Sequence, residues 1–458
     1  MNPKISNPRG TVLKRAAARA AMLGVAVALA GCGSLDLTNP NSPPEELVLN
    51  TPEGIISLAN GMQAQYAGTG VGTGMVLNKV RASALVTDEW STTTLALAAD
   101  RSLATGTGVD GSFGVVTSPY TTGFRVIRTA NLLLQNAPAV FPGPSIGTGI
   151  VATAKTFKAM TLGDLILLYP QVPFNNVIGG NPLQPRAAVL DSVIALLESA
   201  RADMASVTAG QLGDFTTRVQ GGGYNLVNVI NAMLARYYLL DGDYNAAITA
   251  AGRVPLNTVS VFTYPDPIRN PVWGYSFSLN YVRGENTFFT EAETYVVDSA
   301  GTPVTRRDLR PSYWLRTDQP TSTGNPSITL RNLRRFQERN ESYPIYLPDE
   351  MRLIQAEAYT RLGNFGQAAT LVNQVRTQQS STLDEPVAGL PALPAAALDT
   401  EAELLTEIVK QRRFELYAQG LRWEDLRRLA PYAGGKTPTI QFLPLPQGEC
   451  LYNPDVDC

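Results

Sequence analysis

Paired helical segments joined by short turns are the feature that most constrains the fold of this chain. In residues 347–376, LPDEMRLIQAEAYTRLGNFGQAATLVNQVR, apolar side chains recur at helical spacing through Met351, Ile354 and Ala358. The glycine and asparagine of RLGNF interrupt this pattern before a second amphipathic stretch begins. The segment therefore predicts a helix, a short turn and a second helix, with alanines that let the two helices approach closely.

The same design occurs in NVINAMLARYYLLDGDYNAAITAAGRV, residues 228–254. In both segments an Ala- and Leu-rich helix precedes a glycine turn, an aromatic residue and a pair of alanines, which matches the spacing of a tetratricopeptide-type unit. Further helical patterns cover residues 123–138, 152–170, 187–204 and 401–428, the last one broken near Gly420. We therefore predict a mostly α protein built on a tetratricopeptide-like scaffold of helical hairpins.

Three tracts show weak periodicity and are predicted to be irregular. Residues 104–123 are rich in Gly, Thr and Ser, residues 255–345 hold many Pro, Tyr, Trp, Asn and Arg, and residues 377–398 contain Pro and Ala. Long irregular loops in a folded protein often carry its function. We expect the ligand surface to come from these tracts, above all from the loop-rich insert at about 255–345.

The amino-terminal segment has the pattern of a bacterial lipoprotein signal. Residues 1–19 carry five basic side chains and no acid, and residues 20–30, AAMLGVAVALA, are apolar and too short to span a bilayer. Leu-Ala-Gly-Cys then ends at Cys32, whose thiol is the expected site of lipidation. We predict a signal peptide over residues 1–31; an ordinary cleaved signal with an incidental cysteine is the alternative.

Residues 32–52 are predicted to be a lipidated flexible tether. Prolines at four positions oppose a regular helix, and the Asn and Ser between them favour turns. These prolines are Pro40, Pro43, Pro44 and Pro52. The folded domain is then expected over residues 53–458. The lipid on Cys32 would hold it to the membrane through more than one acyl chain, as stable anchoring requires.

Composition excludes several classes of function. With 31 of the 458 residues removed, 427 remain, and 32 basic against 39 acidic side chains give them a balance of −7. An acidic chain argues against nucleic acid as a partner. The chain has no histidine, which excludes Ser-His-Asp and Cys-His catalysis and any His-ligated zinc site. No cofactor or metal site is predicted, since no dense loop of oxygen ligands occurs.

Cys450 and Cys458 are expected to form a small disulfide loop, or to be two unpaired thiols.

Several segments together resemble the SusD/RagB family of outer-membrane nutrient-uptake lipoproteins. YLPDEMRLIQAEAYTRLGNFGQAATLVNQVR is similar to the family's central helical hairpin, and LLTEIVKQRRFELYAQGLRWEDLRRL to its most distinctive segment. The tail FLPLPQGECLYNP resembles its closing segment, and TDEW (residues 87–90) lies where the family has a variable acidic and aromatic loop. The terminal cysteine pair departs from the family pattern.

The resemblance implies a helical lipoprotein on the outer surface that caps a TonB-dependent barrel of the SusC type. Such proteins capture glycans or other nutrients, pass them to the barrel and are not enzymes. Oligosaccharide or another nutrient would then be the ligand, the barrel the protein partner, and the lipid anchor the contact with the outer membrane.

The charged residues of the last helical segment favour a structural role over a site. Glu424 and Arg428 are four residues apart and are expected to pair on one helical face, as are Arg422 and Asp425 three apart. The Trp423 ring is expected to pack between helices, with its N–H bound to a buried acceptor. The full set is Arg413, Glu415, Arg422, Trp423, Asp425 and Arg428.

Two pairs of adjacent carboxylates raise the hypothesis of a glycoside hydrolase. A hydrolase needs two carboxyl groups about 5 to 9.5 Å apart across the bond to be cut. Asp88-Glu89 and Asp349-Glu350 are neighbours in sequence, so their side chains point in different directions. Asp349-Glu350 is instead expected to begin a helix, where acids interact favourably with the helix dipole.

Ligand binding is expected to use aromatic side chains in loops. The flat C–H faces of sugar rings pack on aromatic planes, while Asn and Arg side chains bond the hydroxyls. The candidates are Trp90, Trp273, Tyr275, Asn280, Tyr281, Arg283 and Trp314, the last beside Tyr313. For each aromatic ring, packing of its own loop onto the helices is the competing interpretation.

The sequence thus predicts a cell-surface, substrate-binding lipoprotein that captures oligosaccharides and passes them to a SusC-like transporter. Two alternatives stay open. A tetratricopeptide-type scaffold that binds proteins of the cell envelope explains the helical pairs equally well, but not the aromatic-rich insert. A glycoside hydrolase is the third hypothesis.

Overall fold

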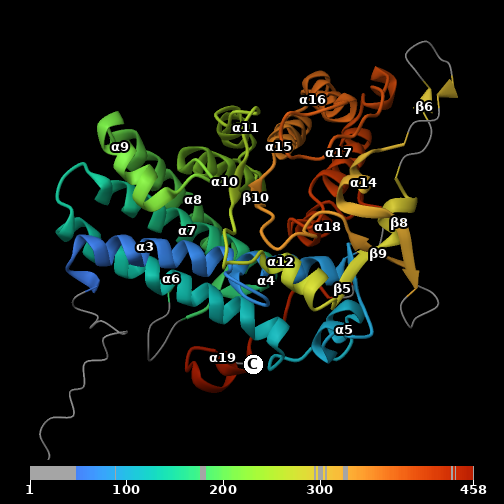
Figure 1. Cartoon of the computed structure of the whole chain (residues 1–458). Helices are drawn as coiled ribbons and strands as arrows, with labels where there is room; N and C mark the ends of the chain where they lie inside the picture. Colours follow the sequence, from blue (N-terminus) through green and yellow to red (C-terminus); the bar gives the residue numbers. More distant parts are fainter. Residues whose placement is uncertain are drawn as a thin grey trace, which may run out of the picture. The chain divides into compact units, whose positions relative to one another are not determined.

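A row of packed helices forms the scaffold of the described chain (Figure 1). The computed structural model describes residues 48–87, 89–175, 182–292, 296–297, 303–304, 307–322, 329–434, 437–438 and 440–456. The row consists of α3 (Pro52–Ala67), α6 (Gly114–Val140), α7 (Ile146–Leu168), α8 (Arg186–Ser206), α10 (Leu226–Asp241), α11 (Tyr244–Gly252), α15 (Pro348–Arg361), α16 (Phe365–Thr377) and α17 (Glu401–Glu415). Each helix contacts the next one in this order, and α17 packs on both α15 and α16. The predicted hairpins α6–α7, α10–α11 and α15–α16 are confirmed.

Residues in the predicted turns cap the helices. The Asn225 side chain accepts a hydrogen bond from the Asn228 amide before α10, and the Asp243 carboxylate accepts one from the Ala246 amide before α11. Thr400 and Glu403 form a reciprocal capping box at the start of α17. These bonds satisfy amides that have no partner inside the helix, so the turn sequences fix where each helix begins.

Shorter elements lie beside the row and form most of the predicted insert. The helices are α4 (Gly74–Val86), α5 (Ala98–Thr105), α9 (Ala209–Phe215), α12 (Pro271–Trp273), α13 (Asn286–Thr290), α14 (Arg310–Trp314), α18 (Arg422–Arg428) and α19 (Gln447–Tyr452). The strands are β1 (Trp90–Thr92), β2 (Gln171–Val172), β3 (Gln184–Pro185), β4 (Ser260–Phe262), β5 (Val282–Glu285), β6 (Val296–Val297), β7 (Pro303–Val304), β8 (Leu315–Ser322), β9 (Thr329–Leu333) and β10 (Tyr343–Tyr346). A π-helical turn, Gly274–Ser278, continues α12.

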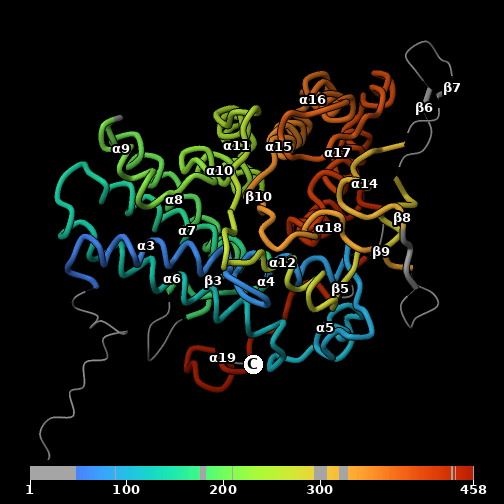
Figure 2. The backbone as a smooth tube through the Cα atoms, viewed as in Figure 1, coloured from blue at the N-terminus to red at the C-terminus, as the bar shows by residue number. Residues whose placement is uncertain are grey.

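One antiparallel sheet organises the insert. Its strand order is β1-β5-β9-β8, with Trp90 opposite Gly284 and Gly284 opposite Arg331. A second pair, β4 with β10, brings Phe262 opposite Tyr343 just before α15 begins. Strands β5 and β9 contact the π-helical turn that continues α12, and α14 contacts β8; the backbone tube labels these elements in Figure 2. The sheet therefore joins β1, which follows α4, to strands of the insert. The β4–β10 pair then precedes α15, where the row of helices continues.

Helix α4 is buried along its whole length, which requires its charged side chains to be paired. All of its residues from Gly74 to Val86 are buried. The Lys79 ammonium lies 3.2 Å from the Asp164 carboxylate of α7. Burial lowers the pKa of Lys79, although Asp164 acts in the opposite direction. The helix is thus fixed in the core by an ion pair as well as by apolar packing.

Two glycines are required by the packing of the row. A Cβ at Gly163 of α7 would overlap the Tyr237 hydroxyl of α10, so only glycine lets these helices approach as they do. Gly420 has a φ of 72° in the turn between α17 and α18, as expected for a glycine that ends a helix. The predicted break near Gly420 is confirmed.

Two expectations about irregular segments are wrong. Pro52, assigned to the tether, is the first residue of α3, a position where its missing N–H costs nothing and Thr51 provides the cap. The tract 104–123 is helical from Gly114, because α6 begins there and continues through Pro119. Residues 32–47 of the predicted tether, with Cys32, lie outside the described residues.

Candidate ligand-binding site

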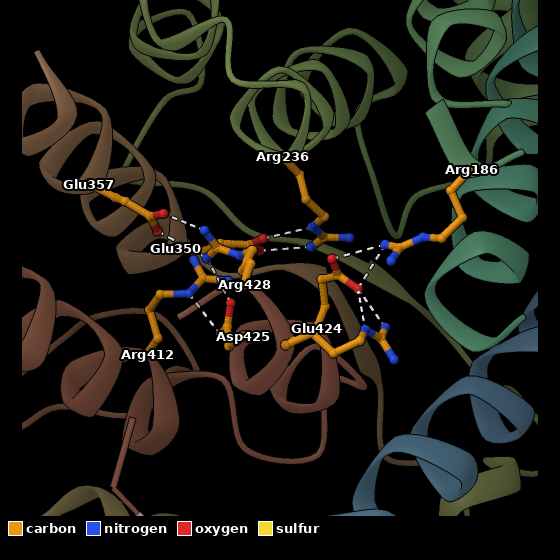
Figure 3. Close-up of polar contacts among 9 residues, drawn as sticks. Arg186, Arg236, Glu350, Glu357, Arg412, Glu424, Asp425 and Arg428 are labelled. Atoms are coloured by element: carbon orange, nitrogen blue, oxygen red, sulfur yellow. Dashed lines mark hydrogen bonds and ion pairs between the residues drawn. The ribbon is translucent and has the colours of Figure 1, made fainter. Parts of the chain in front are cut away.

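The charged motif residues of α17 and α18 lie in a buried ion-pair network (Figure 3). The Arg428 guanidinium binds the Glu357 carboxylate of α15 and lies 2.8 Å from Asp425. Asp425 also accepts a hydrogen bond from Arg412 Nε at 2.8 Å. These contacts join α15, α17 and α18, which confirms that the motif has a structural role.

The same network reaches α8 and α10. Glu424 accepts bonds from Arg186 of α8 at 2.9 Å and from its neighbour Arg427 at 2.9 Å (Figure 3). Arg236 of α10 binds both oxygens of Glu350, at 2.7 and 2.8 Å. The network therefore fixes the relative positions of helices that are far apart in sequence.

Two of the predicted pairings within α18 are wrong. Glu424 does not pair with Arg428, and Asp425 does not pair with Arg422. Glu424 is bound instead by Arg186 and Arg427, and Asp425 by Arg412 and Arg428. Arg422 instead donates a hydrogen bond to the Gly434 carbonyl at 2.9 Å. The Trp423 indole donates to the Ile440 carbonyl at 3.2 Å, as predicted.

The adjacent carboxylates that the structure describes are all buried. Asp349 and Glu350 begin α15, as predicted, and both are buried in ion pairs, with Arg352 and Arg236 respectively. Glu89 is buried and accepts a hydrogen bond from the Ala418 amide at 3.2 Å, whereas its neighbour Asp88 lies outside the described residues. No described member of these pairs faces an open cleft.

Three of the candidate aromatic side chains are buried rather than exposed. Trp90, Tyr275 and Trp314 are 0%, 2% and 1% exposed. Trp90 lies in strand β1 of the sheet, and the Trp314 indole donates to the Phe414 carbonyl at 3.0 Å. Their large rings fill the space between the sheet and the helices, so the expectation that they reach solvent is wrong for these three.

The remaining candidates lie in an exposed aromatic segment, defined here as residues 273–283. The Trp273 and Phe277 rings are 6.5 Å apart with planes 24° from parallel, as side chains four positions apart on a helical turn allow. Phe277 is 53% exposed, and Trp273 and Tyr281 are half-buried. The segment therefore presents aromatic surface to solvent.

A buried polar cluster supports this segment from below. Asp100 of α5 binds the Arg81 guanidinium of α4 and accepts a hydrogen bond from the Tyr275 hydroxyl. Burial raises the pKa of Tyr275, so this phenol stays protonated and donates. The Tyr275 ring in turn meets the Tyr281 ring edge to face, with centroids 5.4 Å apart. The half-buried Tyr281 ring thus packs on a buried, hydrogen-bonded tyrosine.

Polar groups hold the end of the segment in an unusual backbone conformation. Asn280 has a φ of 53°, and its carbonyl accepts a bond from the Thr93 hydroxyl at 2.6 Å. Arg283 Nε donates to the Asn280 side-chain oxygen at 3.0 Å. Leu95 and Leu97, 60% and 46% exposed, lie in the loop that Thr93 begins. The structure therefore brings Asn280 to Arg283 and Tyr281 to Tyr275, while Trp273 lies at the start of the segment beside Phe277.

A polar cleft of about 470 Å³ lies between α3, the loop Gly68–Gly74 and α6. Its lining combines apolar surface with hydroxyl, amide and guanidinium groups, and its polar residues are Gln65, Thr69, Thr73, Thr117, Ser118, Thr121, Thr122 and Arg125. Sequence reasoning missed these residues. The signal was present in the spacing of Thr117, Thr121 and Arg125, which repeats every four residues along one face of a helix.

The loop Gly68–Gly74 touches both the cleft and the start of the aromatic segment. Gly274 lies so close to Val71 that a Cβ there would meet it at 2.8 Å, and Gly68 lies beside Pro271. The cleft and the aromatic segment are therefore separated by one short loop. Together they provide aromatic planes and hydrogen-bonding groups, the two features that sugars require.

Other predicted features are tested only in part. Cys450 is disulfide-bonded, while Cys458 lies outside the described residues, so their pairing stays a prediction. Within the described ranges, no group of three or more Cys, Asp or Glu side chains is arranged to hold a metal ion. None of the helices described is both long enough and apolar enough to cross a bilayer.

Comparison with known protein families gives a match over the second half of the chain. A sequence model of the SusD family matches residues 189–452, which include the α10–α11 and α15–α16 hairpins and the ion-pair motif. A shorter match, 36% identical over 80 residues, is to the SusD-like protein P38 of Formosa agariphila. The aligned part covers 17% of this chain and 15% of that relative.

Solved structures resemble the chain over most of its length. A SusD superfamily protein of Bacteroides fragilis has a TM-score of 0.68 at 17% identity and covers 90% of this chain and 100% of its own. A SusD-like carbohydrate binding protein of the same species gives 0.64 at 16% identity, with the same coverage. A laminarin binding SusD-like protein gives 0.55 at 15% identity and covers 87% of this chain and 96% of its own. At these identities the likeness establishes the fold.

Proposed function

The chain belongs to the SusD family, and from this premise we propose that it captures oligosaccharides at the cell surface and delivers them to a SusC-like, TonB-dependent barrel in the outer membrane. Two of the similar structures are described as a carbohydrate binding protein and a laminarin binding protein. These descriptions support a carbohydrate, such as a glucan, as the class of ligand.

The observation that carries the proposal is the pair of a half-buried Trp273 and an exposed Phe277 beside the polar cleft. The two near-parallel rings offer flat apolar surface for sugar C–H faces. The threonines and Gln65 of the cleft offer donors and acceptors for hydroxyl groups across the loop Gly68–Gly74. An oligosaccharide that crosses this loop would use both surfaces at once.

The proposed role is binding without catalysis. The carboxylates that raised the hydrolase hypothesis, Asp349 and Glu350, neutralise Arg352 and Arg236 inside the fold. A general acid and a nucleophile must instead reach the scissile bond from a shared cleft. Capture and release of an unchanged glycan requires only the surface that the aromatic segment and the polar cleft supply.

Lipidation of Cys32 and a place on the outer membrane are part of the same proposal. The basic and apolar leader and the Leu-Ala-Gly-Cys sequence support this part. Mass spectrometry of the native protein should find an acylated Cys32 at the amino terminus. An intact leader, or a Cys32 without fatty acid, would remove the basis for a surface tether.

A binding screen tests the ligand. The protein without residues 1–32 is applied to an array of polysaccharides that includes laminarin, with a matched W273A/F277A variant as control. We expect at least one glycan to bind the parent protein and to be lost in the variant. Binding to no glycan on the array would contradict the proposed ligand class.

Isolation from solubilised outer membranes tests the partner. We expect the native protein to co-purify with a large β-barrel of the SusC type. A protein found only with other envelope proteins, and never with a barrel, would favour the scaffold alternative over the transport role.

A further inference from the structure

We infer that the oligosaccharide bound in the polar cleft is anionic, and that Arg125 of α6 binds the carboxylate or sulfate ester of one of its sugar units. The inference rests on the proposed capture of oligosaccharides and narrows the class of ligand. It depends on the position of Arg125, which lines the polar cleft and also a second pocket of about 290 Å³. The two pockets share Thr121 as well, so they adjoin along this face of α6.

Among the residues that line the polar cleft, Arg125 is the only one with a charged side chain. The other lining residues are glycine, alanine, serine, threonine and glutamine. Hydroxyl and amide groups of this kind are sufficient for a neutral sugar. A guanidinium group is suited to a carboxylate or a similar oxyanion, because it offers parallel N–H donors together with a positive charge. The lining of the cleft therefore favours a sugar that carries an anionic group.

The Arg125 guanidinium is available to a ligand. It is exposed, and none of the described residues forms an ion pair or a hydrogen bond with it. The arginines of the ion-pair network differ, since Arg186 is bound by Glu424 and Arg428 by Glu357. Arg125 can therefore bind an anion without first losing a contact within the described part of the protein.

A second donor group lines the adjoining pocket together with Arg125. The Asn175 side-chain oxygen accepts hydrogen bonds from Lys158 Nζ at 2.7 Å and from Asn131 Nδ2 at 3.1 Å. Because an ammonium group can only donate, the bond from Lys158 fixes which way the Asn175 amide is turned. Its Nδ2 group has no acceptor among the described residues. The pocket thus offers a fixed amide donor beside the guanidinium, and two donors of this kind suit a group that can only accept, such as a carboxylate.

One acid, Glu449 of α19, lines the same adjoining pocket and gives the charge test a second direction. Its Oε2 accepts a hydrogen bond from Asn453 Nδ2 at 2.9 Å. A carboxylate at this place repels an anionic ligand bound at Arg125. Loss of the Glu449 charge should therefore strengthen the binding of an anionic glycan, whereas loss of the Arg125 charge should weaken it.

Calorimetric titration of the full chain with paired polysaccharides tests the inference. The acidic probes are polygalacturonate and κ-carrageenan, and their neutral partners are carboxyl-reduced polygalacturonate and desulfated carrageenan. We expect at least one acidic probe to bind about 10-fold or more tightly than its neutral partner, and added salt to reduce this difference. A preference for polygalacturonate identifies a carboxylate as the recognised group, and a preference for κ-carrageenan identifies a sulfate ester.

Three variants assign the preference to its residue. R125Q should bind the acidic probe about 10-fold more weakly and so lose the preference over the neutral partner. The matched control is R128Q, which should keep the affinity of the parent, because Arg128 is also exposed on α6 but lines neither pocket. E449Q should bind the acidic probe about 2-fold to 3-fold more tightly, in line with the loss of one partly exposed charge.

The outcomes separate this inference from the proposed function. Equal affinity for the acidic probes and their neutral partners, or full affinity for the acidic probe in R125Q, would overturn the inference and leave the capture of oligosaccharides standing. A loss in R128Q as large as that in R125Q would also overturn it, because the preference would then come from the general charge of α6. Binding of no glycan, acidic or neutral, would overturn the inference and the proposed function together.

Discussion

Asp425 and Glu415 are two buried acids whose surroundings shift their pKa in opposite directions. Burial alone would raise the pKa of Asp425, but Arg412 and Arg428 outweigh it and the pKa is lowered. Burial and the neighbouring charge of Asp349 raise the pKa of Glu415 well above its usual value, against the effect of Arg310. Asp425 is therefore held as a carboxylate, whereas Glu415 retains its proton to a higher pH.

This difference predicts very unequal costs for neutral substitutions. The Asp425 carboxylate accepts hydrogen bonds from Arg412 Nε and Arg428 Nη2, both at 2.8 Å. D425N removes its negative charge and leaves these two guanidinium groups without that counterion. Breaking a buried pair in this way costs about 3–5 kcal/mol. E415Q replaces an acid whose charged form is already disfavoured by burial with an amide of the same shape, and its contact with Arg310 Nη1 is already long at 3.5 Å. We expect E415Q to cost about 1 kcal/mol or less.

Urea denaturation of both variants at pH 7 measures the two costs. The midpoints should separate while the slopes stay equal, since neither change alters the surface exposed on unfolding. A loss of stability in E415Q as large as that in D425N would refute the opposite pKa shifts of the two acids.

Three further predictions follow from the structure. The pKa of Glu424 is lowered, because Arg427 and Arg186 outweigh burial. The stability that Glu424 contributes is therefore present above its unfolded pKa of about 4.3 and is lost as the pH falls below that value. The melting temperature of E424Q should fall less steeply with decreasing pH than that of the parent. G163A should cost about 1–3 kcal/mol in urea denaturation, because its Cβ would overlap the Tyr237 hydroxyl, and G163A/Y237F should recover part of that loss. Y275F should cost about 1–2 kcal/mol in the same assay, because buried Asp100 loses a donor but keeps Arg81; an unchanged stability would mean that this hydroxyl does not hold the aromatic segment.

Helical hairpins with a marked turn were predictable from sequence, whereas the buried helix α4 was not. In α10–α11 and α15–α16 a glycine turn separates two Ala-rich helical stretches, although α10 and α15 are themselves largely buried. Helix α4 is buried along its whole length, so apolar and paired polar residues occur all round it and leave no periodic signal. Its charged residues acquire partners only through contacts such as Lys79 with Asp164.

The lack of a local sequence signal also explains which site residues were wrongly predicted and which were missed. Trp90 and Trp314 look like Trp273 in sequence, since each lies beside polar loop residues. Trp90 is buried by a sheet whose strands come from residues 90 to 333, and such long-range pairing has no local signature. The ion pairs show the same effect, since Arg186 and Glu424 are 238 positions apart. The polar cleft likewise needs α3 and α6 to meet.

Ligand-dependent tryptophan fluorescence tests the central claim most directly. Of the four tryptophans, Trp90, Trp314 and Trp423 are at most 1% exposed, so Trp273 is the one placed to sense a bound sugar. Titration with oligosaccharides from the array should give a saturable change in emission, and W273A should lose that change together with at least about 10-fold in affinity by calorimetry. No saturable change with any oligosaccharide, or full affinity in W273A, would contradict the account.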